Sequence, residues 1–405
     1  MKIKQKKETK LSQLVILLFA IAGGMSVANV YFAQPLLKIM AAELGINQGS
    51  SGIVITITQI GYGLGLFFIV PLGDVFNRRK MIVGQLLLTV VLLLIIGWMP
   101  NKNIFLICMA FMGLFAVVTQ VLVAYAASLV TAEDRGRVVG QITSGIVLGI
   151  LLARTIAGVM ADIAGWRSVY YLSAFLILVL AIALFKVLPV KDEHKVILPY
   201  PKLLQSMVRL FVTERILRIR AIIALLLFAS FGTLWTALVL PLSDPPYSFS
   251  SSLIGLFGLI GVAGALGATS AGKRADRGLG QQTTGIALTL LFLSWGAIAF
   301  TTHSLSALIL GIIVLDLAVQ AVHVTNQSMI FKLNPEARSR IVAVYMMFYS
   351  IGSGVGSIAS TKIYVHLGWI GVCALGASFS LLALVIWAVT LKRQNALVVQ
   401  MVECK

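Results

Sequence analysis

Apolar runs of about 20 residues recur along this chain, and they limit its fold more than any other feature. A helix of that length crosses the hydrocarbon core of a bilayer, and in lipid only helices and closed barrels satisfy every backbone polar group. We place twelve such runs, at roughly 12–33, 51–71, 81–99, 104–130, 138–161, 168–188, 221–241, 251–271, 282–301, 305–331, 341–363 and 369–391. The sequence therefore predicts an all-α integral membrane protein with twelve transmembrane helices.

The composition agrees with a protein whose main partner is the lipid bilayer. Of the 405 residues, 59% are hydrophobic and 11% are charged, and the mean hydropathy is +0.99. A soluble protein of this length carries about a quarter charged residues. The lysine-rich start and the apolar residues after it resemble a signal peptide, but the apolar run is too long for one. We therefore expect an uncleaved first helix.

The net charge of +18 is distributed unevenly between the two predicted sides of the membrane. Of the 32 lysines and arginines, 27 fall in the two termini and in alternate loops, at 77–80, 131–137, 186–220, 272–277 and 332–340. The opposite loops hold only Lys38, Lys102, Arg167 and Lys362, and Arg154 lies within a helix. This asymmetry is typical of the positive-inside rule. It predicts a multi-pass protein of the cytoplasmic membrane with both termini cytoplasmic, and no nucleic-acid partner.

Three loop motifs recur at a nearly constant offset. The matching pairs are Asp74 and Asp276, 202 residues apart, Arg135 and Arg338, 203 apart, and Trp166 and Trp369, 203 apart. One register kept through three loops indicates an internal duplication. We expect two six-helix repeats, 1–188 and 221–405, joined by a cytoplasmic linker at 189–220. Part of that linker, KLLQSMVRLFVTERILRI, is amphipathic and is expected to lie on the membrane surface.

The loop motif PLGDVFNRRK carries a resemblance to a known family. It keeps the leucine, acid and paired bases of the family signature at Leu72, Asp74, Arg78 and Arg79, and the second copy keeps Gly272, Asp276 and Arg277. Val70, Val75 and Asn77 stand where glycine, arginine and glycine are usual. With the repeat and the central linker, these residues resemble the major facilitator superfamily over the whole length, closest to its twelve-helix drug/proton antiporter-like branch.

The resemblance implies a secondary transporter whose two halves rock around a central site. It also implies gating roles for the loop residues Asp74, Arg78, Arg79, Asp276 and Arg277. Two departures concern the branch: Met109 stands where a basic residue is usual, and Arg154 in GILLARTIAG replaces the proline of the antiporter signature. The resemblance therefore supports a transporter more strongly than a multidrug antiporter.

The resemblance further implies that helices 1, 4, 7 and 10 line the central cavity. The tenth run contains LDLAVQAVHVTNQ, in which Asp316, Gln320, His323 and Gln327 are spaced by four, three and four and so share one helical face. From these helices we predict substrate contacts at Asn29, Tyr31, Gln120, Trp235, Gln320, His323, Asn326 and Gln327. Polar residues of this kind also hydrogen-bond between helices, for under about 1 kcal/mol each on average.

Two charges lie deep in the predicted helices. An ionised side chain at mid-bilayer costs at least about 2.5–3.5 kcal/mol, so such a residue usually faces a cavity, pairs or carries protons. Asp316 and Arg154 lie 16 and 17 residues from Lys332 and Arg137, which places both at roughly 25 Å from the same surface. We predict that Asp316 couples transport to protons with Arg154 as its partner. A static ion pair is the alternative.

The leading hypothesis is proton-coupled efflux of a small organic solute by a protein that works as a monomer. Uptake by a proton symporter of the same fold, or a non-transporting receptor, are the alternatives. The helices show no phosphate-binding loop, metal-ligand cluster or nucleophile–base set, so we expect no enzyme, no cofactor and no metal. The weakly charged cavity mildly favours a neutral or cationic substrate.

Overall fold

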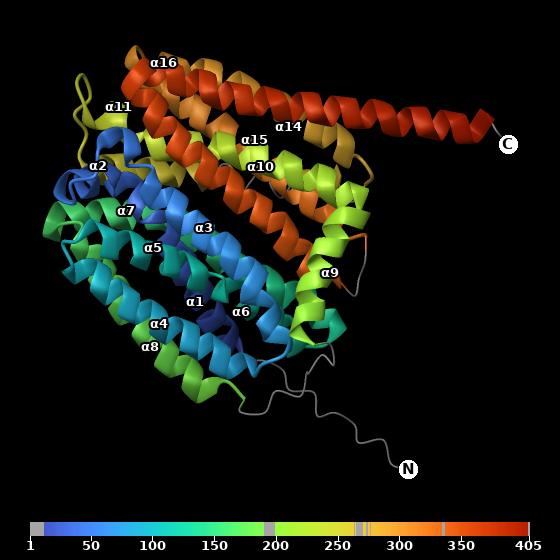
Figure 1. Cartoon of the computed structure of the whole chain (residues 1–405), viewed down its shortest axis with the longest axis horizontal. Helices are drawn as coiled ribbons and strands as arrows, with labels where there is room; N and C mark the ends of the chain where they lie inside the picture. The colour runs from blue at the N-terminus through green and yellow to red at the C-terminus, as the bar shows by residue number, and fades with distance from the viewer. Residues whose placement is uncertain are drawn as a thin grey trace.

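The computed structural model describes residues 12–189, 199–262, 264, 270–272, 274–275, 277–333 and 337–403, except for the side chains of 74, 132–133 and 392–403. That part of the chain is built from helices (Figure 1). The first half contains α1 (Gln13–Tyr31), α2 (Ala33–Glu43), η1 (Gln48–Ser50), α3 (Ile53–Phe68), η2 (Val70–Asp74), α4 (Arg78–Trp98), α5 (Lys102–Ala116), α6 (Val118–Ser128), α7 (Ala132–Ala164) and α8 (Arg167–Val187). The second contains α10 (Arg215–Ala237), α11 (Val239–Ser243), α12 (Ser251–Leu256), η3 (Phe257–Gly261), α14 (Gly280–Ala299), η4 (Phe300–Thr302), α15 (Leu305–Ile330) and α16 (Arg338–Glu403), and α9 (Tyr200–Thr213) lies between the halves.

The predicted twelve-helix membrane fold is confirmed. Ten segments of the described chain are long and apolar enough to span a bilayer, and Ser251–Gly261 is the described part of the eighth run. The last of the ten, Arg338–Leu391, covers two predicted runs, because Gly368 interrupts the helix with φ 63° and ψ −159°. That left-handed backbone favours glycine, which has no Cβ to clash.

The first and seventh helices each have a break near a proline. Pro35 has no N–H to give to the carbonyl of Tyr31, and Pro241 has none for Ala237, so the helices are interrupted at Phe32 and Leu238. The chain continues beyond each break as α2 and α11. The first helical segment therefore runs to Glu43, ten residues past the predicted end at 33, because AQPLLKIMAAE remains helical beyond the kink.

Within each repeat, small residues bring one pair of helices into close contact, and the pairs in the two repeats are equivalent. In the first half α1 packs on α7, and in the second α10 packs on α16. A Cβ at Gly24 of α1 would lie 2.6 Å from the carbonyl oxygen of Gly145 in α7, and Gly352 of α16 lies similarly against the backbone of Leu225. Packing through glycine is how transmembrane helices approach closely. Figure 1 shows the blue-to-green and the yellow-to-red helices on different sides of the molecule.

The outer faces of the helices are apolar. On α4, Leu86 and Leu93 are fully buried, whereas Leu88, Val91 and Trp98 are 50%, 53% and 73% exposed. In a soluble protein such a surface would mark an interface. On a chain with this many spanning helices, it is the surface that lipid covers.

The two matched tryptophans both use their indole N–H groups. Trp166 donates to Glu43 Oε2 at 2.5 Å, and Trp369 donates to the carbonyl oxygen of Ile298 at 3.1 Å. Arg167 also binds the Glu43 carboxylate. Burial alone would raise the pKa of Glu43, but the hydrogen bonds from Trp166 and Arg167 outweigh it and hold this pKa below its usual value.

Helix α9 contacts both halves at one end of the bundle (Figure 1). Tyr200 Oη donates to the Phe68 carbonyl at 2.7 Å, and Arg340 Nη1 donates to Ser206 Oγ at 2.8 Å. Leu203 and Met207 bury its apolar face. The amphipathic sequence is thus divided at Glu214, and α10 begins at Arg215, six residues before the predicted seventh run.

Candidate functional site

Arg154 of α7 lies at the contact between the halves and is 3% exposed. Its Nε donates to Gln34 Oε1 of α2 at 2.7 Å. Its guanidinium carbon lies 3.8 Å from the ring centroid of Trp235 in α10, 5.2 Å from that of Tyr31 and 5.9 Å from that of Phe231. Nη2 is buried and has no hydrogen-bond partner. The side chain is therefore stacked on aromatic rings but only partly satisfied by hydrogen bonds.

Asp316 of α15, 5% exposed, accepts a hydrogen bond from Trp235 Nε1 at 3.2 Å. The predicted partner Arg154 forms no ion pair with it within 4.0 Å; both residues belong to the described chain. Trp235 instead contacts both residues, because the Arg154 guanidinium stacks on its ring and its N–H donates to the Asp316 carboxylate. We call Arg154, Trp235 and Asp316 the central triad.

A row of glycines on the eighth helical segment faces this triad. A Cβ at Gly258 would lie 2.9 Å from Arg154 Cβ, and one at Gly261 would lie 3.1 Å from Asp316 Oδ2. One at Gly264 would lie 3.0 Å from Gln320 Cγ. The row therefore places bare backbone against charged side chains of α7 and α15.

Aromatic hydroxyls continue from the triad into the second half. Tyr31 and Tyr349 of α16 share a hydrogen bond of 2.6 Å between their hydroxyls. The ring of Tyr349 lies 6.1 Å from that of His323, and His323 Nδ1 is 3.0 Å from Tyr345 Oη. The structure thus brings Tyr31, Trp235 and His323 of the predicted substrate contacts into one connected region.

Arg220 is another buried base, in addition to Arg154. It lies in α10, is 2% exposed, and donates from Nη1 to Thr284 Oγ1 at 3.2 Å and to Asn326 Oδ1 at 3.1 Å. Asn326 Nδ2 in turn donates to Tyr345 Oη at 3.4 Å. From sequence, Arg220 is predicted in the linker because its neighbours include two more arginines. The helical start at Arg215 places it inside the second half.

The remaining predicted substrate contacts are dispersed. Asn29 is fully buried and accepts from Ser173 Oγ at 2.7 Å, where α1 meets α8. Gln120 Nε2 is 3.5 Å from Tyr62 Oη, its hydrogen-bond acceptor. Gln320 and Gln327 are half-buried on α15.

The predicted gating residues are only partly described. Arg78 Nε donates to the carbonyl of Gly73 at 2.8 Å, and Arg79 donates to the carbonyl of Phe185. Arg277 is exposed. Asp276 and the side chain of Asp74 lie outside the described residues, so their gating roles stay predictions.

The two ends of the bundle differ in how the halves meet. We call them the Arg78 end and the Lys38 end. At the Arg78 end a cavity lies between η2 and α6 of the first half and α9 and α16. Its lining residues are Val70, Pro71, Gly73, Arg78, Gln120, Val121, Ala124, Met207, Ser339, Arg340 and Ala343.

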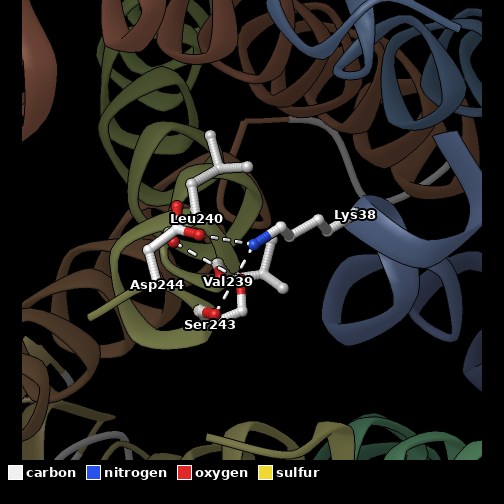
Figure 2. Close-up of polar contacts among 5 residues, drawn as sticks. All are labelled: Lys38, Val239, Leu240, Ser243 and Asp244. Atoms are coloured by element: carbon white, nitrogen blue, oxygen red, sulfur yellow. Dashed lines mark hydrogen bonds and ion pairs between the residues drawn. The ribbon is translucent and has the colours of Figure 1, made fainter. Parts of the chain in front are cut away.

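At the Lys38 end the halves are joined by polar contacts. Figure 2 shows Lys38 of α2 reaching Asp244, just after α11, with Nζ 2.6 Å from Oδ1. Lys38 Nζ also lies 3.5 Å from the Ser243 carbonyl oxygen. Between α3 and α16, Thr56 Oγ1 donates to the Gly354 carbonyl at 2.7 Å. Polar contacts therefore join the halves directly at the Lys38 end, and a small cavity lies between them at the Arg78 end.

Comparisons with known proteins agree on one family. The sequence profile of the Major Facilitator Superfamily matches residues 19–286 and 221–398. YgaY of Escherichia coli (strain K12), named as a transporter, is 46% identical over 392 residues, covering 96% of this chain and 99% of YgaY. The inner membrane transport protein YnfM of the same strain is 26% identical over 370 residues, covering 90% of this chain and 87% of YnfM.

Solved structures share the fold at low sequence identity. The nucleoside transporter NupG has a TM-score of 0.74 at 15% identity, with 93% of this chain and 99% of that chain covered. A bacterial homologue of the human lysosomal transporter Spinster, solved inward-facing and occupied, has a TM-score of 0.74 at 12% identity, with 94% and 96% covered.

Proposed function

Because the chain belongs to the major facilitator superfamily, we propose that it exports a small organic solute in exchange for protons, as a monomer, by alternating access. It is a multi-pass membrane transporter and not an enzyme. The finer assignment is to the drug/proton antiporter-like branch. The central triad supports proton coupling. Among the described residues, it is where a buried acid, Asp316, and a buried base, Arg154, both contact one aromatic side chain, Trp235.

The triad divides between the proposed halves, 1–188 and 221–405. Arg154 and its acceptor Gln34 belong to the first half, whereas Trp235 and Asp316 belong to the second. When the halves rock, Arg154 moves away from Trp235 and Asp316. An ionised carboxylate left without a nearby positive charge is costly at this depth, so Asp316 takes up a proton in that state and releases it when Arg154 returns.

Substrate would bind beside the triad, in the region that opens as the halves separate. Tyr31, Trp235, Gln320 and His323 lie around it and supply rings and hydrogen-bonding groups. Gln120 and Gln327 extend this lining toward the Arg78 end. Asn29 and Asn326 are proposed to support the lining from behind, because Ser173 binds Asn29 Oδ1 and Arg220 binds Asn326 Oδ1.

We propose that the Arg78 end faces the cytoplasm and that both termini lie there, in the cytoplasmic membrane. The uneven distribution of basic residues supports this, and the relative YnfM is named an inner membrane protein. In cells carrying Lys102→Cys or Asp244→Cys, an impermeant maleimide added from outside should label the new cysteine but not Cys404. Labelling of Cys404 in intact cells would reverse the orientation.

Transport itself is tested in proteoliposomes that carry an imposed proton gradient. A panel of antimicrobials, sugars, amino acids and aromatic acids is added while internal pH and solute content are followed. An exporter moves at least one solute uphill against an inward proton flow. Uphill uptake together with protons would identify a symporter instead. Ligand binding without solute flux or counterflow would contradict transport and favour the receptor alternative.

A further inference from the structure

The buried guanidinium of Arg154 is not neutralised by an ion pair within the described residues. Arg154 and Asp316 are both buried, but no nitrogen of Arg154 lies within 4.0 Å of an Asp316 oxygen. A buried charge without full compensation is unfavourable. A site of this kind favours a ligand that brings its own negative charge.

Arg154 holds an unused donor at the place where such a ligand would bind. Its Nε is occupied by Gln34, but Nη2 is buried without a partner. A buried donor left unsatisfied costs about 1–3 kcal/mol, and more when it is charged. Since Gln34 and Arg154 belong to the same proposed half, rocking keeps their bond and removes the Trp235 ring from the guanidinium. The movement therefore turns Nη2 toward the opening cavity.

The neighbouring groups are aromatic. The faces of Trp235 and Tyr31 and the ring of Phe231 surround the guanidinium. Once Arg154 leaves, the Trp235 face offers a stacking surface for a flat ring. A carboxylate on an aromatic ring combines the two features, because a guanidinium binds a carboxylate through paired N–H groups.

We infer that the transported substrate is an aromatic organic monoanion whose carboxylate binds Arg154 Nη2 and whose ring stacks on Trp235. This inference rests on the proposed transport function and names its substrate class. It replaces the expectation of a neutral or cationic substrate, which considered the apolar lining without the unpaired donor.

The test is equilibrium binding to the full chain in nanodiscs at pH 7, using 2-naphthoate and its neutral isostere 2-naphthamide. A hydrogen bond to a charged group is worth about 1.5–3 kcal/mol, so the acid should bind roughly 10- to 150-fold more tightly than the amide. Equal affinities would mean that Nη2 is satisfied by water alone and would overturn the inference. Binding of laurate but not of 2-naphthoate would also overturn it, by assigning the carboxylate to a lipid-derived acid.

Two variants assign the effect to Arg154. Arg154→Gln should reduce the affinity for the acid to that for the amide. Gln34→Glu keeps an acceptor for Nε and nearly the same side-chain size, but it places a carboxylate of the protein beside Arg154. This variant should therefore lose binding of the acid. Gln48→Glu, the same change at an exposed position, is the matched control and should bind as the unaltered chain does. Monodisperse elution and an unchanged unfolding temperature are required of Gln34→Glu, and retained acid selectivity in it would overturn the inference.

The two proposals fail separately. Acid-selective binding without solute flux would refute the proposed transport and leave the anion site standing. Uphill flux of neutral or cationic solutes without acid binding would refute the anion site and leave transport standing.

Discussion

The two buried arginines, Arg154 and Arg220, differ in where their partners come from. Arg154 bonds Gln34 in its own half but stacks on Trp235 of the other half, and it keeps one donor unpaired. Arg220 is bound by Thr284 and Asn326, both from its own half. A rocking motion changes the contact of Arg154 with Trp235, keeps its bond to Gln34, and changes neither hydrogen bond of Arg220. Partners that cross between the halves therefore mark groups that change environment during transport, and partners within one half mark supports.

The largest effect is expected for a group whose partner lies in the other half. Asp316→Asn should abolish proton-driven accumulation, because the amide cannot carry a proton between states. One charge moving through 100 mV supplies about 2.3 kcal/mol, roughly a 50-fold solute gradient, all of which should be lost. Exchange of solute down its own gradient should persist in proteoliposomes.

Asp134→Asn is the matched control for this variant, since Asp134 pairs with Arg137 of its own helix α7, within one half and away from the triad. It should keep uphill transport. Accumulation by Asp316→Asn at the level of the unaltered chain would reduce Asp316 to a structural residue.

Trp235→Phe tests the link between the two charges. Phenylalanine keeps a ring beneath Arg154 but cannot donate to Asp316. Losing a hydrogen bond to a charged group weakens coupling by about 1.5 kcal/mol, a roughly tenfold change in proton-driven rate. The rate of downhill exchange is the internal reference. An equal fall in both rates would indicate that the larger indole surface, and not its N–H, is needed.

The supporting role of Arg220 is tested by measuring the stability of a variant. Arg220→Met removes two hydrogen bonds and leaves Thr284 and Asn326 short of a donor, so unfolding should become easier by about 1–3 kcal/mol. Arg154→Met leaves Gln34 short of a donor, but Asp316 can take up a proton in its place, so the loss of stability should be smaller than in Arg220→Met. The measurement is the unfolding temperature of both variants in one detergent. A greater loss in Arg154→Met would contradict the distinction between the two arginines.

A smaller effect is expected at the Lys38 end. The pair of Lys38 and Asp244 crosses the halves, but its side chains are 37% and 43% exposed, and such pairs contribute up to about 1 kcal/mol. Asp244→Asn should therefore move the balance between the two states by no more than about fivefold, toward opening at this end.

Maleimide labelling of a cysteine beside Tyr31 reports that opening. The charge-reversed double variant Lys38→Asp with Asp244→Lys should return labelling toward its original rate. High salt should mimic Asp244→Asn. Identical labelling in all three chains would show that the pair does not hold this end closed.

The smallest effect on stability is expected for Glu43, whose partners Trp166 and Arg167 lie in the same half. Since its pKa in the folded chain is lowered, the carboxylate adds stability at pH values above the ordinary carboxyl pKa, and this stability is lost as the pH falls through the lowered value. The half-exposed carboxylate makes the effect small. The unfolding temperatures of the unaltered chain and Glu43→Gln should differ near pH 7 and converge in acid. A constant difference would contradict the titration.

The fold could be predicted because the length and spacing of apolar runs reflect the thickness of a bilayer, which every spanning helix must match. Boundaries were less certain where charge or proline interrupts a run. The start of α10 at Arg215 was missed because an arginine on a helix with neutral partners from α14 and α15 looks, in sequence, like an arginine in a loop.

For the residues of the site, the sequence predicts the level along each helix axis but not the direction in which each side chain points around that axis. Counting residues placed Arg154 and Asp316 at one level, yet only side-chain directions show Trp235 between them. Likewise Asn29 has the same polarity as its neighbours, but its side chain meets Ser173. The orientation of a residue around its helix axis depends on partners that are distant in sequence.

The glycine row opposite the triad has a consequence for how related carriers could differ in substrate size. Because Gly258, Gly261 and Gly264 present no side chains, the volume beside Arg154 and Asp316 is limited by backbone on that wall. A single added methyl at Gly261 would extend to within 3.1 Å of Asp316 Oδ2. Selection for smaller solutes could therefore act through this uncharged helix, narrowing the chamber without altering any residue that binds substrate or carries a proton.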